Sequence, residues 1–179
     1  MTWPEYRFYS SEHTKIKNQK MENREQHERF MRMAIELADM SVATGGGPFG
    51  AVVVRNGEVI ARGTNNVTKL NDPTAHAEVQ AIRHACAELE NFNLAGCTVY
   101  TSCEPCPMCL SAIYWAGIDK IYYANTRGDA AMIDFDDSLI YDEIPKAPTM
   151  RQIPAEQLLR EEALHTFRLW QEKEDKVEY

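Results

Sequence analysis

Metal-binding residue types stand at the starts of two predicted helices, and this pairing limits how the chain can fold. The first motif is His76-Ala77-Glu78, and the second is Pro105-Cys106-Pro107-Met108-Cys109. Pro107 suits the first turn of a helix, because its missing N–H would have no partner there in any case. Cys106 and Cys109 then share one helix face, so both sulfur atoms can bind one metal ion. A fold that serves both motifs must bring two helix starts together.

The number of ligands predicts what kind of metal site this is. A Cys-x-x-Cys pair alone also fits a redox pair or half of a structural zinc knuckle. Cys103, which ends a predicted strand, is the alternative fourth ligand of a closed structural site. Together with His76 and Glu78, the two cysteines Cys106 and Cys109 favour three protein ligands and an open fourth position, as in catalytic zinc sites. We expect one zinc ion per chain, with Glu78 beside it as a base.

Hydrophobic patterning predicts a mixed α/β fold. Apolar residues recur with helical spacing after Met21 until Gly45-Gly46-Gly47-Pro48 ends the helix. Asn56-Gly57 between two apolar runs predicts a two-residue hairpin. Further helices are predicted over residues 75–90, 107–116 and 154–173, and strands over residues 51–54, 58–61, 97–101 and 120–124. The helix over 107–116 is nearly all apolar and is expected to be buried.

The charge and the cysteine content of the chain restrict the classes of partner and the cellular compartment that we expect. The 179 residues include 19 Lys and Arg against 27 Asp and Glu, a net charge of −8, which does not favour nucleic acid as the main ligand. No apolar run is long enough to cross a membrane. The first twenty residues lack the apolar segment of a secretory signal, and three of the five cysteines are clustered. We therefore expect a cytoplasmic protein with no membrane or nucleic-acid partner.

Beyond these patterns, the chain resembles the cytidine-deaminase superfamily, and within it the small bacterial guanine deaminases. The pattern H-x-E followed by P-C-x-x-C is the known signature of zinc deaminases. The resemblance covers about residues 21–179. It is carried by these motifs: Gly46-Gly47-Pro48-Phe49-Gly50-Ala51, Asn65-Asn66-Val67-Thr68, Asn71-Asp72-Pro73-Thr74-Ala75-His76-Ala77-Glu78, Tyr100-Thr101-Ser102-Cys103-Glu104-Pro105-Cys106-Pro107-Met108-Cys109, Ala112-Ile113-Tyr114-Trp115-Ala116, Phe135-Asp136-Asp137-Ser138-Leu139-Ile140-Tyr141 and Glu178-Tyr179. The first four recur loosely in tRNA adenosine and cytosine deaminases, and the last three favour guanine.

The resemblance implies a fold and an organisation. It implies a three-layer α-β-α, cytidine deaminase-like fold, with a mixed sheet of about five strands and helices on both faces. The parts are an N-terminal extension over residues 1–20, a zinc deaminase core over residues 21–153, and a C-terminal helix and tail over residues 154–179. This last segment is expected to be exchanged between the subunits of a homodimer.

The resemblance also implies roles for individual residues. Zn²⁺ would be held by His76, Cys106 and Cys109, with Glu78 as the catalytic proton shuttle. Phe49 would stack on the purine, Asn65 and Asp137 would read its edge, and Trp115 would line the pocket. Tyr179 would reach in from the partner subunit. The implied substrate-binding set is Phe49, Asn65, Ala77, Trp115, Asp137 and Tyr179. The residues alone also allow simpler interpretations. Trp115 could be a core residue, Asp137 a solvated acidic residue, and Tyr179 part of a frayed terminus.

The implied reaction is hydrolytic deamination of guanine to xanthine and ammonia. A buried carboxylate such as Asp137 suits guanine, which presents N–H donors where adenine and cytosine present an acceptor nitrogen. The alternatives are a tRNA adenosine deaminase, a cytosine or triazine deaminase of the same superfamily, and a non-catalytic zinc scaffold. Acidity of residues 127–143 and of the C-terminal helix disfavours the tRNA enzyme. The presence of Glu78 and the count of three ligands disfavour the scaffold.

Overall fold

The computed structural model describes the backbone of residues 8–178 and the side chains of residues 21 and 23–178. The chain divides into two compact units, Met1–Arg127 and Gly128–Tyr179. The elements up to the boundary are α1 (Phe8–Ala43), β1 (Gly50–Arg55), β2 (Glu58–Thr64), α2 (Val67–Leu70), α3 (Ala77–Glu88), β3 (Cys97–Cys103), α4 (Pro107–Trp115) and β4 (Lys120–Asn125). Beyond it follow α5 (Arg127–Ala131), α6 (Ser138–Glu143), a 3₁₀ turn (Pro148–Met150) and α7 (Arg160–Glu172).

The first unit is built on a mixed sheet with the strand order β2-β1-β3-β4. Strand β1 pairs antiparallel with β2 and β3, and β3 pairs parallel with β4. The described residues thus form four strands, against an expectation of about five. The parallel pair requires a crossover, which α4 supplies between β3 and β4.

The hairpin between β1 and β2 turns where the sequence predicts it. Asn56 and Gly57 both have positive φ, 52° and 79°. Two left-handed residues in succession are what a type I′ turn needs, and its twist matches that of the flanking strands. The hairpin prediction is confirmed.

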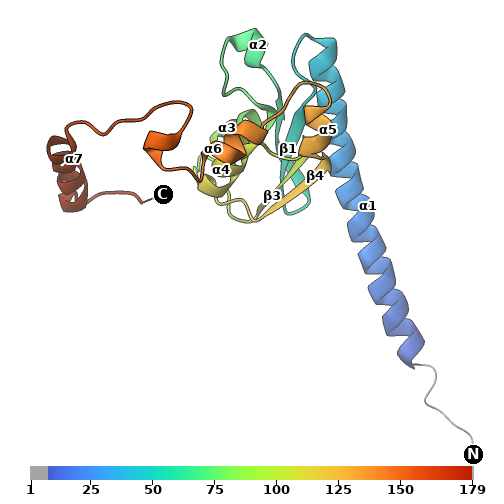
Figure 1. Ribbon diagram of the computed structural model, residues 1–179. Helices are drawn as coiled ribbons and strands as arrows, with labels where there is room; N and C mark the ends of the chain where they lie inside the picture. The colour runs from blue at the N-terminus through green and yellow to red at the C-terminus, as the bar shows by residue number, and fades with distance from the viewer. Residues whose placement is uncertain (1–7, 179) are drawn as a thin grey trace, which may run out of the picture. The chain divides into compact units, whose positions relative to one another are not determined.

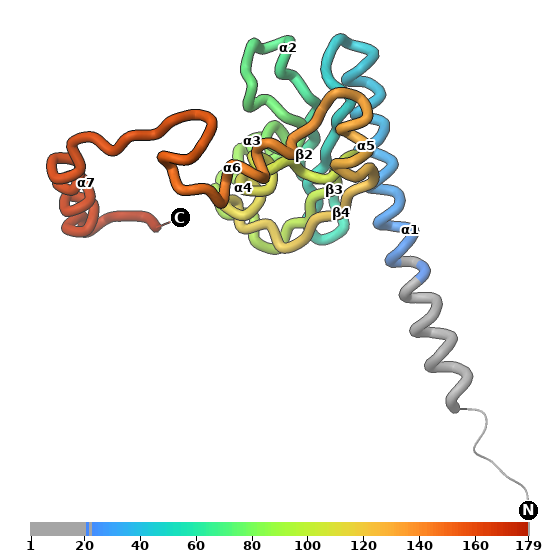
Figure 2. The backbone as a smooth tube through the Cα atoms, in the orientation of Figure 1, coloured from blue at the N-terminus to red at the C-terminus, as the bar shows by residue number. Residues whose placement is uncertain are grey.

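Helices cover both faces of the sheet, as the three-layer prediction requires (Figure 1). On one face, Phe30 and Ala34 of α1 pack on Val52, Val54 and Tyr100. On the other, apolar residues of α3 and α4 pack on the alternate positions of the same strands: Ala51, Val53, Ala61 and Val99. Figure 2 traces α3 and α4 on the side of the sheet away from α1. Two helices on one face can bring their N-terminal ends together at one edge.

A histidine of α1 ties this helix to the sheet. The Nδ1 atom of His27 lies 2.6 Å from the Tyr100 hydroxyl, and Nε2 lies 3.1 Å from the Tyr122 hydroxyl. The two tyrosine rings stack with centroids 5.0 Å apart. These bonds satisfy polar groups beside the α1 core, and they give His27 a structural role.

Two helices differ from the sequence-based expectation in their bounds. Helix α1 begins at Phe8, whereas the apolar pattern predicts a helix only from Met21. The C-terminal helix begins at Arg160 rather than Pro154, after Leu159 with left-handed backbone (φ 51°). Glu161 and Glu162 occupy its first turn, where acidic side chains favour the helix dipole.

Helix α4 is less buried than the sequence predicts. Only Pro107, Cys109 and Ile113 of this helix are buried, while Tyr114 and Trp115 are 78% and 70% exposed. One face packs on the core and the other is an apolar surface. Separately, none of the described helices is long and apolar enough to cross a membrane.

Candidate metal centre

His76 is placed by the first residues of α3. It is the N-cap residue of that helix, with extended backbone, and its carbonyl accepts the amide of Gln80 at 2.9 Å. The position of α3 is fixed by close approach to β2 at Gly63. A Cβ atom at Gly63 would lie 2.0 Å from the carbonyl oxygen of Ala77 and 2.6 Å from the amide nitrogen of Ala81. The missing side chain therefore sets how near the start of α3 lies to the sheet.

Cys106 and Cys109 are placed by the start of α4. Strand β3 ends at Cys103, and Cys106 is the N-cap of the helix that follows. Pro107 occupies the first helical turn, as the sequence predicts. Cys109 lies in the same turn and is fully buried. Both thiols therefore lie at the N-terminal end of α4, where the helix dipole favours negative charge.

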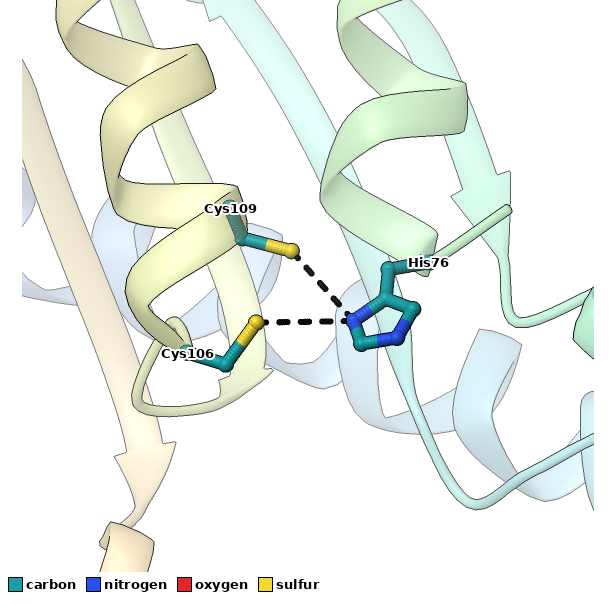
Figure 3. Close-up of side chains that lie close together, drawn as sticks. All are labelled: His76, Cys106 and Cys109. Carbon is teal, nitrogen blue, oxygen red and sulfur yellow. Dashed lines mark hydrogen bonds between the residues drawn. The ribbon is translucent and has the colours of Figure 1, made fainter. Parts of the chain in front are cut away.

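The three side chains meet at these two helix starts (Figure 3). Nδ1 of His76 lies 3.6 Å from Sγ of Cys106 and 3.5 Å from Sγ of Cys109. The ligand atoms of the three residues all lie within 4.8 Å of one another. On a tetrahedral zinc ion, with Zn–S about 2.3 Å and Zn–N about 2.0–2.1 Å, the sulfur and nitrogen atoms are about 3.6 Å apart. The observed spacing therefore fits zinc.

Cys103 is not part of this group. Its thiol donates to the carbonyl oxygen of Thr126 at 3.5 Å, at the end of β4. Within residues 21 and 23–178, the His/Cys/Asp/Glu group that can hold a metal comprises His76, Cys106 and Cys109. The arrangement matches an open three-ligand site and not a closed one built with Cys103.

Glu78 lies beside the metal-binding group, only 6% exposed. The Thr101 hydroxyl donates to Oε1 of Glu78 at 3.2 Å, and the Cys109 thiol donates to Oε2 at 3.4 Å. Each carboxylate oxygen thus has its own partner. The structure therefore brings together His76, Glu78, Cys106 and Cys109, four residues that the sequence singles out.

Burial and mutual contacts shift the acidity of these groups. Burial raises the pKa of Glu78, so this carboxyl takes up a proton more readily than one in water. A hydrogen bond from Cys109, followed by one from His76, lowers the pKa of Cys106 to about 4. The pKa of Cys109 is raised, first by the hydrogen bond that its thiol makes with Cys106 and then by burial. The pKa of His76 is raised by its hydrogen bond with Cys106.

Four of the predicted substrate-binding residues belong to the first unit. Asn65 is buried, and its backbone amide donates to the carbonyl of Phe49 at 3.1 Å, so these two are neighbours. Phe49 itself packs against the core between the sheet and α3 and α4. Ala77 is fully buried beside His76, and Trp115 ends α4 with most of its side chain exposed.

The other two predicted substrate residues lie elsewhere in the chain. Asp137 precedes α6 in the second unit, as its N-cap residue. Tyr179 lies outside the described residues. The assignment of all six residues to the substrate stays a prediction.

The sequence-based prediction missed Thr101, which contacts Glu78. A signal for it exists in the alternation along β3. Cys97 and Val99 point into the core between the sheet and α3 and α4, and Thr101 continues this alternation. A hydroxyl on the buried face of a strand needs a hydrogen-bond partner there.

Comparison with known proteins agrees with this geometry. Residues 24–125 match the family model described as the cytidine and deoxycytidylate deaminase zinc-binding region. Guanine deaminase of Bacillus subtilis is 53% identical over 154 residues, covering 86% of this chain and 99% of that protein. Its crystal structure aligns with a TM-score of 0.83, covering 86% of this chain and 98% of that one.

Two further relatives are similar over a smaller part. The tRNA-specific adenosine deaminase of Aquifex aeolicus is 40% identical over 97 residues, which is 54% of this chain and 64% of that protein. A solved guanine deaminase from Nitrosomonas europaea is 36% identical with a TM-score of 0.58, covering 60% of this chain and 63% of that one. The chain belongs to the family of cytidine and deoxycytidylate deaminases, and its His76, Cys106 and Cys109 group accommodates the one Zn²⁺ ion that this family binds.

Proposed function

We propose that this chain hydrolyses guanine to xanthine and ammonia, with Zn²⁺ held by His76, Cys106 and Cys109. The observation that carries the proposal is the buried Glu78 beside a three-residue metal group, in a chain 53% identical to a guanine deaminase along nearly that protein's whole length. The tRNA deaminase relative covers only 54% of the chain. We further propose that the enzyme works in the cytoplasm.

The chemistry divides between the metal and the side chains. When bound, zinc supplies a Lewis acid that makes water a usable nucleophile at neutral pH. Glu78 takes a proton from the attacking water and passes it to the ring nitrogen next to the amine-bearing carbon. The water oxygen bonds to that carbon. Glu78 then takes the second proton of this oxygen and gives it to the amine, the carbon–nitrogen bond breaks, and ammonia leaves while the oxygen remains as the new carbonyl of xanthine. Burial raises the pKa of Glu78, which favours its taking a proton from water.

Substrate recognition is proposed to combine donors and acceptors. Oδ1 of Asn65 accepts the amide of Val67 at 3.3 Å, so the side-chain NH₂ group is assigned as a donor to an acceptor atom of the base. Asp137 is proposed to accept N–H groups of guanine, and Phe49 to stack on the ring. A site with such an acidic acceptor discriminates against bases that lack the N–H groups, because the carboxylate is then left unpaired.

Ammonia release measures the substrate preference directly. We expect the zinc-loaded protein to release ammonia from guanine faster than from guanosine, cytosine, adenine or a tRNA anticodon loop containing adenosine. Selectivity for one donor–acceptor pattern is expected to reach about 10⁴-fold where a buried polar group loses its partner. Preferential deamination of the tRNA loop, or release from none of the substrates, contradicts the proposal.

The proposed assembly is a homodimer that exchanges residues 154–179. The exposed Tyr114 and Trp115 of α4 give the first unit an apolar surface of the kind that interfaces bury. Tyr179 of each chain is proposed to close the substrate site of its partner, which would exclude water from the reacting atoms. The tail that carries it, from Glu174 onwards, has only Val177 and Tyr179 as large apolar residues.

Deleting residues 177–179 is expected to lower guanine turnover strongly, while the zinc content and the dimeric state stay unchanged. The substitution Glu178→Gln in the full-length tail serves as the matched control and is expected to keep the full rate. Ammonia release, metal analysis and light scattering give the three readouts. A truncated protein that works at the full rate contradicts the role of the tail.

Mixed dimers test whether the tail acts on the partner chain. The truncated chain keeps Glu78, and a Glu78→Gln chain keeps the tail, so each homodimer is inactive for a different reason. If tails are exchanged, a mixed dimer contains one complete site, and random assembly restores about a quarter of the full activity. If each tail serves its own chain, mixing restores nothing and the exchange is wrong.

A further inference from the structure

Thr101 is a polar residue buried in the core behind the metal centre. It lies on β3 and is 1% exposed, on the sheet face covered by α3 and α4. Its hydroxyl donates to Oε1 of Glu78 at 3.2 Å. Burying a hydroxyl costs free energy unless it is hydrogen-bonded, so this bond is what makes threonine acceptable at the position.

The bond fixes the orientation of the Glu78 carboxylate. Oε1 is held by Thr101, and Oε2 faces Sγ of Cys109 at 3.4 Å, on the side of the metal-binding group. Rotation of the carboxylate about its Cγ–Cδ bond would break the contact with Thr101. The two oxygens therefore have separate surroundings, one inside the core and one at the metal-binding group.

The strand that carries Thr101 is rigidly held. Thr101 is paired with Ala51 of β1 on one side and with Tyr123 of β4 on the other. A hydroxyl on a strand paired on both sides moves less than one on a loop, so it can hold a second side chain in one geometry.

We infer that Thr101 is a positioning residue for deamination: its hydroxyl holds Oε1 of Glu78 so that Oε2 faces the metal-binding group. This inference rests on the proposed function, in which Glu78 carries protons. Proton transfer requires the donor and acceptor within hydrogen-bond reach and aligned, so a carboxylate that rotates freely spends less time in a productive geometry. Thr101 acts through Glu78 and does not touch the substrate.

The substitution Thr101→Val removes the hydroxyl and keeps the shape of the side chain. We expect kcat for guanine to fall about 10- to 100-fold, because small displacements of a catalytic group have effects of this size. KM, zinc content and melting temperature are expected to stay close to those of the wild type. Thr101→Ser, which restores a hydroxyl, is expected to restore most of kcat.

A matched control lies on the same strand. Thr98 pairs with Val54 and Lys120 and alternates onto the opposite face of the sheet from Thr101. Thr98→Val makes the same chemical change and is expected to leave kcat unaltered. If Thr101→Val fails to fold, Thr101→Ala removes the same hydroxyl and is expected to lower kcat by a similar factor with zinc still bound.

Combining substitutions tests whether Thr101 acts through Glu78. In a Glu78→Gln background, Thr101→Val is expected to cause no further loss of kcat, because there is no proton carrier left to orient. The infrared carboxylate band that Glu78→Gln removes is expected to shift in Thr101→Val, which is a readout independent of turnover. An equal loss of kcat in both backgrounds, an unshifted band, or a rise in KM in place of the fall in kcat overturns the inference.

The same set of variants distinguishes a failure of this inference from a failure of the proposed function. A wild-type protein that does not deaminate guanine, or a Glu78→Gln variant with full turnover, contradicts the function itself. If the wild type is active, Glu78→Gln is not, and Thr101→Val keeps the full kcat, only the role of Thr101 is wrong.

Discussion

Replacing Glu78 with glutamine is expected to lower kcat for guanine by about 10²–10⁴-fold, which is the usual contribution of a positioned proton donor or acceptor. Glutamine has nearly the same shape, and its amide oxygen can still accept a hydrogen bond from the hydroxyl of Thr101. It cannot take up a proton from water or deliver one to the ring nitrogen. The fold and the zinc content are therefore expected to stay as in the wild type. Steady-state ammonia release and metal analysis on the same sample measure both properties.

Glu88→Gln provides the control for that substitution. Glu88 is the last residue of α3, the same helix, and is exposed. Removing its charge is expected to leave turnover unchanged, so a loss seen only at position 78 belongs to the site. Full zinc content together with full turnover in Glu78→Gln would remove this residue from the mechanism and would favour a metal that only stabilises the fold.

The metal centre was predictable because its geometry follows from local chain chemistry. Pro107 marks a helix start, and the spacing of Cys106 and Cys109 puts both thiols in one turn of that helix, as the structure has them. His76 likewise stands at the beginning of α3. Such short-range relations depend on backbone sterics and helix geometry, which are the same in every fold.

Long-range features were less predictable. The apolar composition of α4 predicts burial, yet Tyr114 and Trp115 are exposed, because a helix packed on a sheet buries only one of its faces. Composition alone does not tell an apolar face that packs in the core from one that remains outside it. Thr101 shows the same limit, since its partner Glu78 comes from another element and the pairing depends on how α3 lies across β3.

The N-terminal helix shows how propensity can extend an element without a periodic signal. Residues 8–20 have no apolar stripe, so periodicity predicts no helix there, but the backbone is helical from Phe8. Their Glu, Lys and Gln residues are good helix formers, and they continue a helix that is already nucleated where Phe30 and Ala34 pack on the sheet.

Removing one metal ligand is expected to have a larger effect than removing the proton carrier. Cys109→Ala takes away a buried thiol that lies 3.5 Å from Nδ1 of His76. We expect zinc content to fall toward zero and turnover to fall into the assay background, since enzymes typically accelerate their reactions by about 10⁶-fold or more and the metal is central to this chemistry. Metal analysis and ammonia release measure the two losses.

Stability distinguishes loss of the metal from damage to the core. A ligand that binds only the folded state raises the melting temperature, so chelation of zinc from the wild type is expected to lower it. Chelation is expected to have no further effect on Cys109→Ala, which has no metal to lose. Cys86→Ala, a cysteine of α3 outside the metal group, is the matched control and is expected to keep its zinc and its response to chelation. A Cys109→Ala protein that keeps a full zinc ion and melts lower when chelated would show that the ion is held elsewhere, and the assignment of His76, Cys106 and Cys109 as its ligands would then be wrong.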